Sequence, residues 1–107
     1  MHYVRCINNT GNEVSLTVGQ VYKTLPPSPL ESDEGLLRVI DNEGEDYLYS
    51  QGQFEQVAFH GRPDDAITVH IDPAIKGILH AEALAAHKSI SALVREWIDE
   101  RLDLPIH

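Results

Sequence analysis

Few side chains in this 107-residue sequence are of the types that catalyse reactions or bind metals. Of the six histidines, only His80 and His87 fall in one predicted helix, and they are seven positions apart. Paired metal ligands on a helix usually stand three or four positions apart. The single cysteine, Cys6, lies in an alternating apolar run and is interpreted as a small buried residue. Because a nucleophile–base pair and a glycine-rich phosphate loop are also lacking, we expect no metal, no cofactor and no enzymatic activity.

Aromatic side chains are the first candidates for binding a partner. Tyr22, Tyr47, Tyr49 and Phe54 lie in segments that alternate like strands. Together they could form an aromatic groove that binds a partner protein. In a barrel this small, residues of this kind are more often part of the core or half-buried in a strand, since each ring buries a large apolar area. The sequence leaves both interpretations open.

A second candidate is the segment made of Lys88, Ser89, Ile90 and Ser91. Ser89 is a favourable N-cap, and a helix is predicted to follow it. Free backbone N–H groups at a helix start, together with the helix dipole, attract negative charge. Lys88 adds a positive charge beside them. The segment is therefore predicted to bind an anion.

The charge of the chain limits what that anion can be. The net charge is −9, from 17 acidic and 8 basic residues, and division at Gly61 gives −6 for the first part and −3 for the remainder. Proteins that bind DNA independently of sequence usually have a basic face, because phosphate contacts supply most of their affinity. The acidity is consistent with a solvated surface or with a basic protein partner, and the sequence does not choose between them.

Composition also indicates the compartment. One cysteine cannot form an internal disulfide. No apolar run approaches the ~20 residues that cross a membrane, and the first residues do not have the pattern of a signal peptide. We expect a cytoplasmic protein.

The first part of the chain, residues 1–59, is predicted to be a small closed β-barrel. Its order of elements is similar to that of SH3-like barrels, and closure removes the exposed edges of a small sheet. The alternating run at 14–18 leads to Gly19, the prolines after residue 25 begin an exposed extended loop, and Gly44 is expected at positive φ in a hairpin turn. The predicted strands are residues 3–7, 21–25, 36–40, 46–49 and 53–57.

Residues 60–65 have the composition of a linker, and residues 66–107 form a second predicted module. An alternating strand at 66–71 is followed by a helix that begins at Asp72-Pro73 and ends near His87. A second helix, capped by Ser89, has a broad apolar stripe. One strand and two short helices cannot bury their apolar faces alone, so this module is predicted to pair with a second copy of itself.

These features resemble the ribbon-helix-helix regulators of the Arc and CopG type over residues 65–103. The resemblance includes the alternating strand, the Asp72-Pro73 start and the Ser89-Ile90-Ser91 opening of the second helix. It implies an α+β protein in which a homodimer pairs two strands into a ribbon that enters the DNA major groove. The family usually has glycine at the helix junction, where this sequence has His87, which argues against a left-handed backbone at that position.

The resemblance also implies roles for individual residues. Base contacts would come from Ala66, Thr68 and His70, and phosphate contacts from Lys88, Ser89, Ile90 and Ser91. Because the ribbon has no Arg, Lys, Gln or Asn, its base discrimination is expected to fall below the ~1–3 kcal/mol of a bidentate contact. The dimer core would consist of Ile67, Val69, Ile71, Leu93, Val94, Trp97 and Ile98.

The function expected from the sequence is that of a homodimeric transcriptional regulator that binds a double-stranded DNA operator, with the acidic barrel binding a protein partner. By analogy, such regulators often act as repressors and as antitoxins that mask a basic toxin. The alternative is a dimeric adaptor or inhibitor that does not bind DNA and instead engages a basic or nucleic-acid-binding protein.

Overall fold

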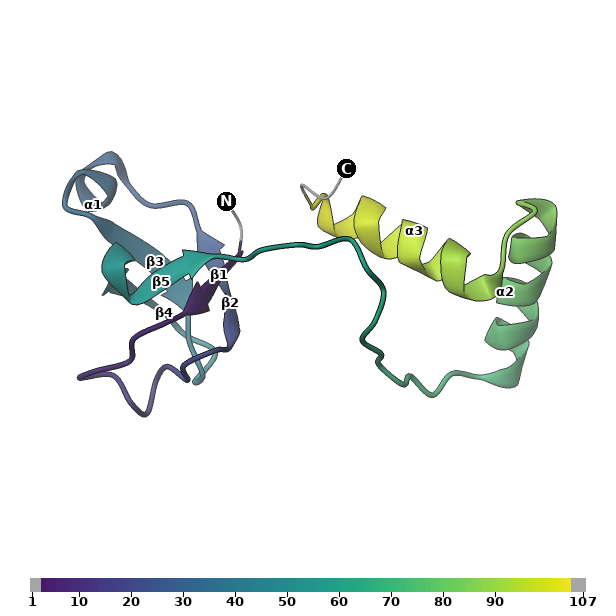
Figure 1. Ribbon diagram of the computed structural model, residues 1–107, viewed down its shortest axis with the longest axis horizontal. Helices are drawn as coiled ribbons and strands as arrows, with labels where there is room; N and C mark the ends of the chain where they lie inside the picture. Colours follow the sequence, from purple (N-terminus) through teal and green to yellow (C-terminus); the bar gives the residue numbers. More distant parts are fainter. Residues whose placement is uncertain (1–2, 105–107) are drawn as a thin grey trace. The chain divides into compact units, whose positions relative to one another are not determined.

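The computed structural model describes residues 3–104, and its contacts divide the chain into an N-terminal unit up to Ala58 and a C-terminal unit from Phe59 (Figure 1). The N-terminal unit is a five-stranded antiparallel sheet, and the C-terminal unit has two longer helices. The predicted α+β class is confirmed. No helix within residues 3–104 combines the length and the apolar character needed to cross a membrane.

The N-terminal sheet has the strand order β4-β3-β2-β1-β5, with all neighbours antiparallel. Each predicted strand is found, with small differences at its ends, but the predicted closure of the barrel is not, since β4 and β5 stand at the two edges of the sheet. A short 3-10 helix, η1 (Gln51–Gln53), joins the two edge strands, β4 and β5. The strands are β1 (Tyr3–Cys6), β2 (Val21–Leu25), β3 (Leu36–Ile40), β4 (Asp46–Ser50) and β5 (Phe54–Gln56).

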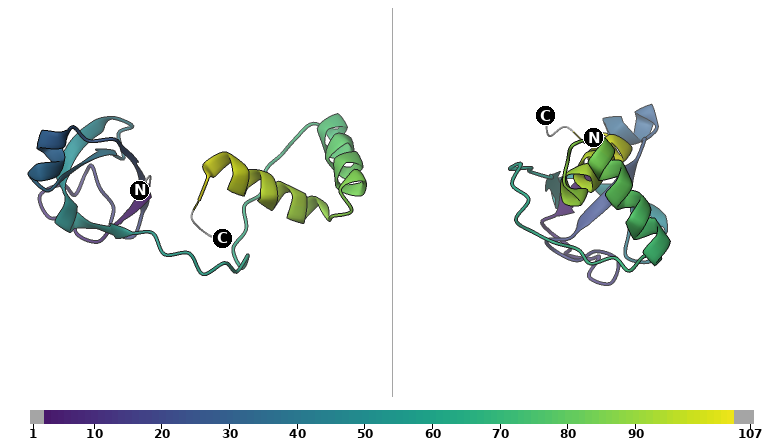
Figure 2. Two further views of the ribbon diagram at one scale, coloured as in Figure 1. Left: turned by 90° about the horizontal axis from the view of Figure 1, so that it is seen from above. Right: turned by 90° about the vertical axis from the view of Figure 1, so that its right-hand side faces the viewer.

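The sheet curls around one hydrophobic core, and Figure 2 shows this curvature. Every strand contributes to the core, and the rings of Tyr49 and Phe54 meet edge to face from β4 and β5 at a centroid distance of 6.2 Å. Cys6 is buried, as predicted from its alternating run. The core residues are Val4, Cys6, Leu16, Tyr22, Val39, Tyr49 and Phe54.

One connecting segment differs from the sequence prediction. The alternating run at 14–18 is a loop in which Leu16 is fully buried, and no strand was predicted there. The predicted extended loop after β2 contains a short helix, α1 (Pro29–Asp33). Ser28 and Glu31 form a capping box, and Pro29 occupies the first turn, where its missing N–H costs nothing. Gly44 has φ of 75°, which confirms the predicted hairpin turn.

The C-terminal unit contains α2 (Pro73–Ala85) and α3 (Ile90–Leu102), as predicted. The Asp72 carboxylate accepts a hydrogen bond from the Ala74 N–H at 2.7 Å. The Ser89 hydroxyl accepts one from the Ala92 N–H at 3.1 Å. Both predicted helix caps are therefore confirmed.

The junction between the helices corrects one expectation. His87 has φ of 57°, so the left-handed backbone forms there without glycine. The N–H of Lys88 donates to the Ala83 carbonyl at 3.0 Å, and the N–H of His87 donates to the Leu84 carbonyl at 3.2 Å. These two bonds make a Schellman motif, which ends α2 and satisfies its last carbonyls.

The predicted strand at residues 66–71 is the other correction. In the single chain this segment has no regular secondary structure, and all of its residues are exposed. A strand is stabilised by hydrogen bonds to a neighbouring strand, and the described residues of the C-terminal unit include no strand to supply them.

Candidate functional site

The C-terminal unit leaves most of its apolar side chains uncovered. Among its described residues only Ala83 and Leu93 are buried hydrophobics, at 3% and 5% exposure. Figure 1 shows that α2 and α3 diverge from the turn that joins them. A monomer rarely exposes so much apolar surface unless that surface binds something. The exposed large hydrophobics are Phe59, Ile67, Val69, Ile71, Ile75, Ile78, Leu84, Trp97, Ile98 and Leu102.

The residues predicted to form a dimer core are unequally covered. Ile67, Val69 and Ile71 alternate along the extended segment, and Ile67 is 83% exposed. On α3, Leu93 is already buried within the chain and Val94 is partly buried. The predicted core list also includes Trp97 and Ile98, which are each 41% exposed. Leu93 thus packs within one chain, while the other predicted core residues retain apolar area that a partner can cover.

The residues predicted to contact bases share one alternation in the extended segment. Ala66, Thr68 and His70 are all exposed. Successive side chains of an extended segment point to opposite sides, so these three would lie opposite Ile67, Val69 and Ile71. They offer a methyl group, a hydroxyl and an imidazole, of which the last two can form a hydrogen bond to a base edge.

The predicted anion site lies at the start of α3. Ser89 uses its hydroxyl as the cap, Ile90 is partly buried and Ser91 is exposed. The first N–H groups of a helix have no partner within the helix, so the N–H groups of Ile90 and Ser91 can bind an external oxygen.

Lys88 has a partner that the sequence interpretation missed. Its Nζ forms an ion pair with a carboxylate oxygen of Glu96, which lies two turns along α3. The carboxylate places negative charge next to the helix start and competes with an external anion for the lysine. Eight residues separate the pair, so neither the three- nor the four-residue helix spacing indicated it.

The structure settles the open question about the aromatic residues of the N-terminal unit. Tyr22, Tyr49 and Phe54 are core residues, so the core interpretation holds for these three and little of their side chains is open to a partner. The Tyr49 hydroxyl donates to the buried carboxylate of Asp41 at 2.8 Å. Burial, together with this bond, raises the pKa of Tyr49 to about 12. Tyr47 is 52% exposed and remains the one candidate contact of the predicted set.

The Tyr22 hydroxyl is also engaged within the N-terminal unit. It accepts a hydrogen bond from the Thr17 N–H at 2.7 Å and donates to Asn42 Oδ1 at 2.6 Å. Asn42 in turn donates to Thr17 Oγ1 at 3.1 Å. These bonds tie the loop around Leu16 to the hairpin that joins β3 and β4, which explains why Tyr22 is an internal residue.

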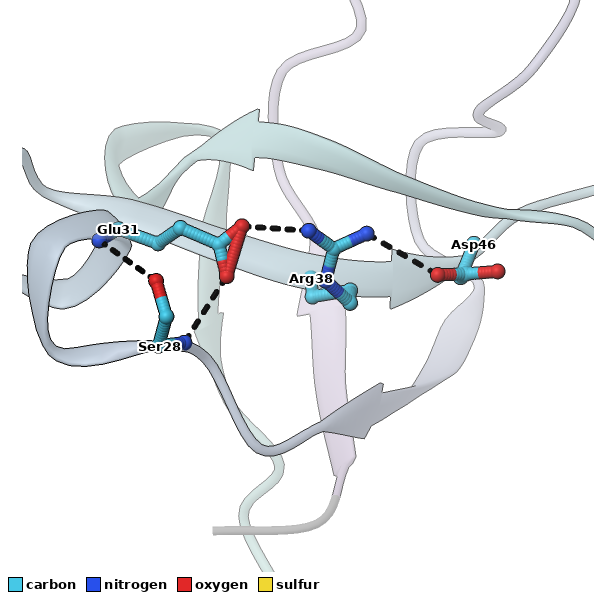
Figure 3. A network of polar contacts seen from close by, with 4 residues as sticks. All are labelled: Ser28, Glu31, Arg38 and Asp46. Atoms are coloured by element: carbon cyan, nitrogen blue, oxygen red, sulfur yellow. Dashed lines mark hydrogen bonds and ion pairs between the residues drawn. The ribbon is translucent and has the colours of Figure 1, made fainter.

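Arg38 is the only basic residue of the N-terminal unit for which the described residues show an ion pair (Figure 3). Its guanidinium contacts Glu31 at 2.5 Å and Asp46 at 3.0 Å. A bond from the Ser28 N–H, aided by Arg38, lowers the pKa of Glu31. Because two carboxylates surround it, Arg38 adds no free positive charge for binding phosphate.

Comparison with known proteins does not extend this picture. No family model, no curated protein and no solved structure matches the chain. Within residues 3–104, no three His, Cys, Asp or Glu side chains are grouped so that they could hold a metal ion. The evidence on function therefore comes from the geometry of the two units.

Proposed function

We propose that the chain is a homodimeric ribbon-helix-helix regulator that binds double-stranded DNA in the cytoplasm. The observation that carries this proposal is the exposed alternation of Ile67, Val69 and Ile71, placed before two capped helices that bury almost nothing themselves. Two such segments pair antiparallel, satisfy each other's backbone groups and cover the apolar sides of both helix pairs.

The same pairing creates the DNA-binding surface. Ala66, Thr68 and His70 of both chains lie on the outer face of the ribbon, where the major groove admits a two-stranded ribbon. The start of α3 in each chain binds a backbone phosphate through the free N–H groups of Ile90 and Ser91, and Lys88 turns from Glu96 to the phosphate. Affinity in this arrangement depends more on phosphate contacts than on base reading.

The N-terminal unit has a different role in this proposal. Its curled sheet is an SH3-like barrel that binds a basic protein, which in an antitoxin would be the toxin. The support is its charge, since the first part of the chain has nine acidic and three basic residues. The toxin is suggested by analogy alone.

Sedimentation of the full chain tests the dimer, and mobility-shift assays with the DNA upstream of its own gene test the regulator. We expect a dimer and a complex at low salt. The double variant Thr68→Ala with His70→Ala should weaken the complex, and Thr10→Ala with His60→Ala is the matched control outside the ribbon. A monomer, or a ribbon variant that binds as well as the wild type, would contradict the proposal.

A dimeric adaptor that does not bind DNA is the second candidate. The pairing of Lys88 with Glu96 and the net charge of −9 favour it, because both reduce the attraction for phosphate. The two candidates share the dimer and differ in DNA binding. A stable dimer that forms no complex even at low salt, and that co-purifies with a basic protein, would select the adaptor.

A further inference from the structure

The N-terminal unit has a groove beside β4 that the two proposed roles of the C-terminal unit do not use. The groove has a volume of about 270 Å³ and lies between the loop at Asn12 and Ser15 and the β3–β4 hairpin. Tyr47 and Leu48 of β4 line it, and both are exposed. An aromatic and an aliphatic side chain, one on each face of β4, therefore lie open beside a sheet edge.

The backbone of β4 at this edge is free to pair. β4 is the outermost strand, bonded to β3 alone. The N–H of Gln51 donates to the Gly35 carbonyl, and the N–H of Asp41 donates to the Glu45 carbonyl. These two bonds determine which residues of β4 direct their backbone N–H and C=O groups toward β3 and which direct them away. The backbone groups of Asp46 and Leu48 consequently point away from β3.

The next backbone N–H of β4 that points away from β3 already has a hydrogen-bond acceptor. The N–H of Ser50 donates to the Gln53 side chain at 3.3 Å. This bond closes the end of the edge near η1. The backbone groups of Asp46 and Leu48 that point away from β3 remain available. They are two residues apart, which is the spacing at which a short added strand forms hydrogen bonds.

The charge around the groove indicates what kind of strand can be added. Glu43 lines the groove, and Glu45 and Asp46 follow it in the hairpin. The Tyr47 hydroxyl donates to Glu45 at 3.2 Å, which holds that carboxylate close to the exposed ring. A second copy of β4 would bring the same carboxylates against these three, and facing like charges destabilise strand pairing.

We propose that the groove beside β4 binds an extended, basic segment of a protein partner, which pairs with the backbone of Asp46 and Leu48. Because side chains alternate along a strand, its apolar side chains contact Leu48 on one face of β4, and its Lys or Arg side chains reach Tyr47, Glu43 and Glu45 on the other. This inference rests on the proposed partner-binding role of the N-terminal unit, and it names the surface and the chemistry of the partner.

A labelled peptide of alternating lysine and valine is a suitable probe of the full-length chain, and the same peptide with glutamate in place of lysine is its control. We expect the basic peptide to bind and the acidic peptide not to bind. Backbone amide shifts in NMR spectra should change most at Asp46 and Leu48. Failure of the basic peptide to bind, or shifts confined to other strands, would overturn the proposal.

Two variants test the two parts of the recognition. Leu48→Pro removes an N–H that points away from β3, so the sheet should tolerate it at an edge, while peptide binding falls about tenfold. Glu43→Gln with Glu45→Gln should weaken binding and flatten its salt dependence. Asp33→Asn with Glu34→Gln removes the same charge from the end of α1 and is the matched control.

Equal binding by the wild type and by both test variants would overturn the proposal. If Leu48→Pro disturbs the fold, the charge variants and the amide shifts still decide the outcome. Dimerisation and DNA binding are measured separately and involve none of these residues. Failure of the groove is thus distinguishable from failure of the regulator.

Discussion

The two units of this protein differ in how far a single chain buries their apolar side chains. The N-terminal unit encloses seven core residues drawn from all five strands and from the loop at Leu16. The C-terminal unit buries two hydrophobics among its described residues, although its helices are longer. We infer that the first unit folds within one chain, while the folding of the second is coupled to association. Trp97 is the only tryptophan, so its fluorescence reports on the second unit alone.

The largest expected effect is the loss of the proposed dimer when a charge enters its core. In Val69→Asp an unpaired carboxylate would have to be buried in the ribbon, which costs more than a small interface provides. We expect a monomer with weakened helical circular dichroism and solvent-exposed Trp97 emission. Thr68→Asp, one residue away on the opposite face, should remain dimeric. Equal dimerisation of both variants would contradict the coupling of folding to association.

A substitution in the core of the N-terminal unit should destabilise that unit and leave the C-terminal unit unchanged. Leu16→Ala leaves a cavity in the N-terminal core and should lower its free energy of unfolding by about 2–5 kcal/mol. Denaturant unfolding followed by tyrosine signals should show the loss. The Trp97 transition should stay at the same denaturant concentration. A shared shift of both transitions would mean that the two units unfold together.

Alkaline pH should destabilise the N-terminal unit selectively. The pKa of Tyr49 is raised from 10 to about 12, so between these values the unfolded chain binds fewer protons than the folded chain. The stability contributed by the protonated hydroxyl is therefore present below pH 10 and is lost as the pH rises toward about 12. In Tyr49→Phe the tyrosine-detected stability should depend less steeply on pH in this window. An unchanged slope would argue against a perturbed Tyr49.

A smaller gain is expected at the junction of α2 and α3. His87 holds a left-handed backbone, which costs a residue with a Cβ roughly 1 kcal/mol relative to glycine. His87→Gly should therefore raise the stability of the C-terminal unit by about that amount, whether in the proposed dimer or alone. His87→Ala, which keeps the Cβ, should give no such gain. The midpoint of the Trp97 transition at a fixed protein concentration measures both.

The smallest effect concerns the ion pair at the start of α3. Glu96→Gln frees Lys88 for phosphate, and because exposed ion pairs are weak, DNA affinity should rise by about fivefold at most. Glu100→Gln, a change of equal charge on the same helix, should raise it less. A titration in which the two variants bind equally would show that only net charge matters.

The sequence predicted elements that are specified locally. Alternation located the five strands, and Asp72 and Ser89 marked the helix starts because a cap needs only its own first turn. The helix α1 is not evident from the prolines, which predict a loop, although Ser28 and Glu31 carry the capping-box signal.

Features that depend on residues far apart in the sequence could not be predicted from local patterns. Burial of Tyr22 and Tyr49 depends on hydrogen bonds to Asn42 and Asp41, and the pairing of Lys88 with Glu96 depends on the turn between the helices. The predicted strand at 66–71 is absent from the single chain, and in the proposed dimer it would form only against a second copy. A pattern within one chain indicates which residues can pair, but it does not supply their partners.

The buried thiol of Cys6 can report how often the N-terminal unit opens. At 1% exposure it is closed to an alkylating reagent while β1 stays paired with β2 and β5. Its rate of modification therefore measures how often the sheet opens, in native buffer and without denaturant. A partner that binds only the closed sheet would slow the labelling of Cys6, even though it never touches the sulfur.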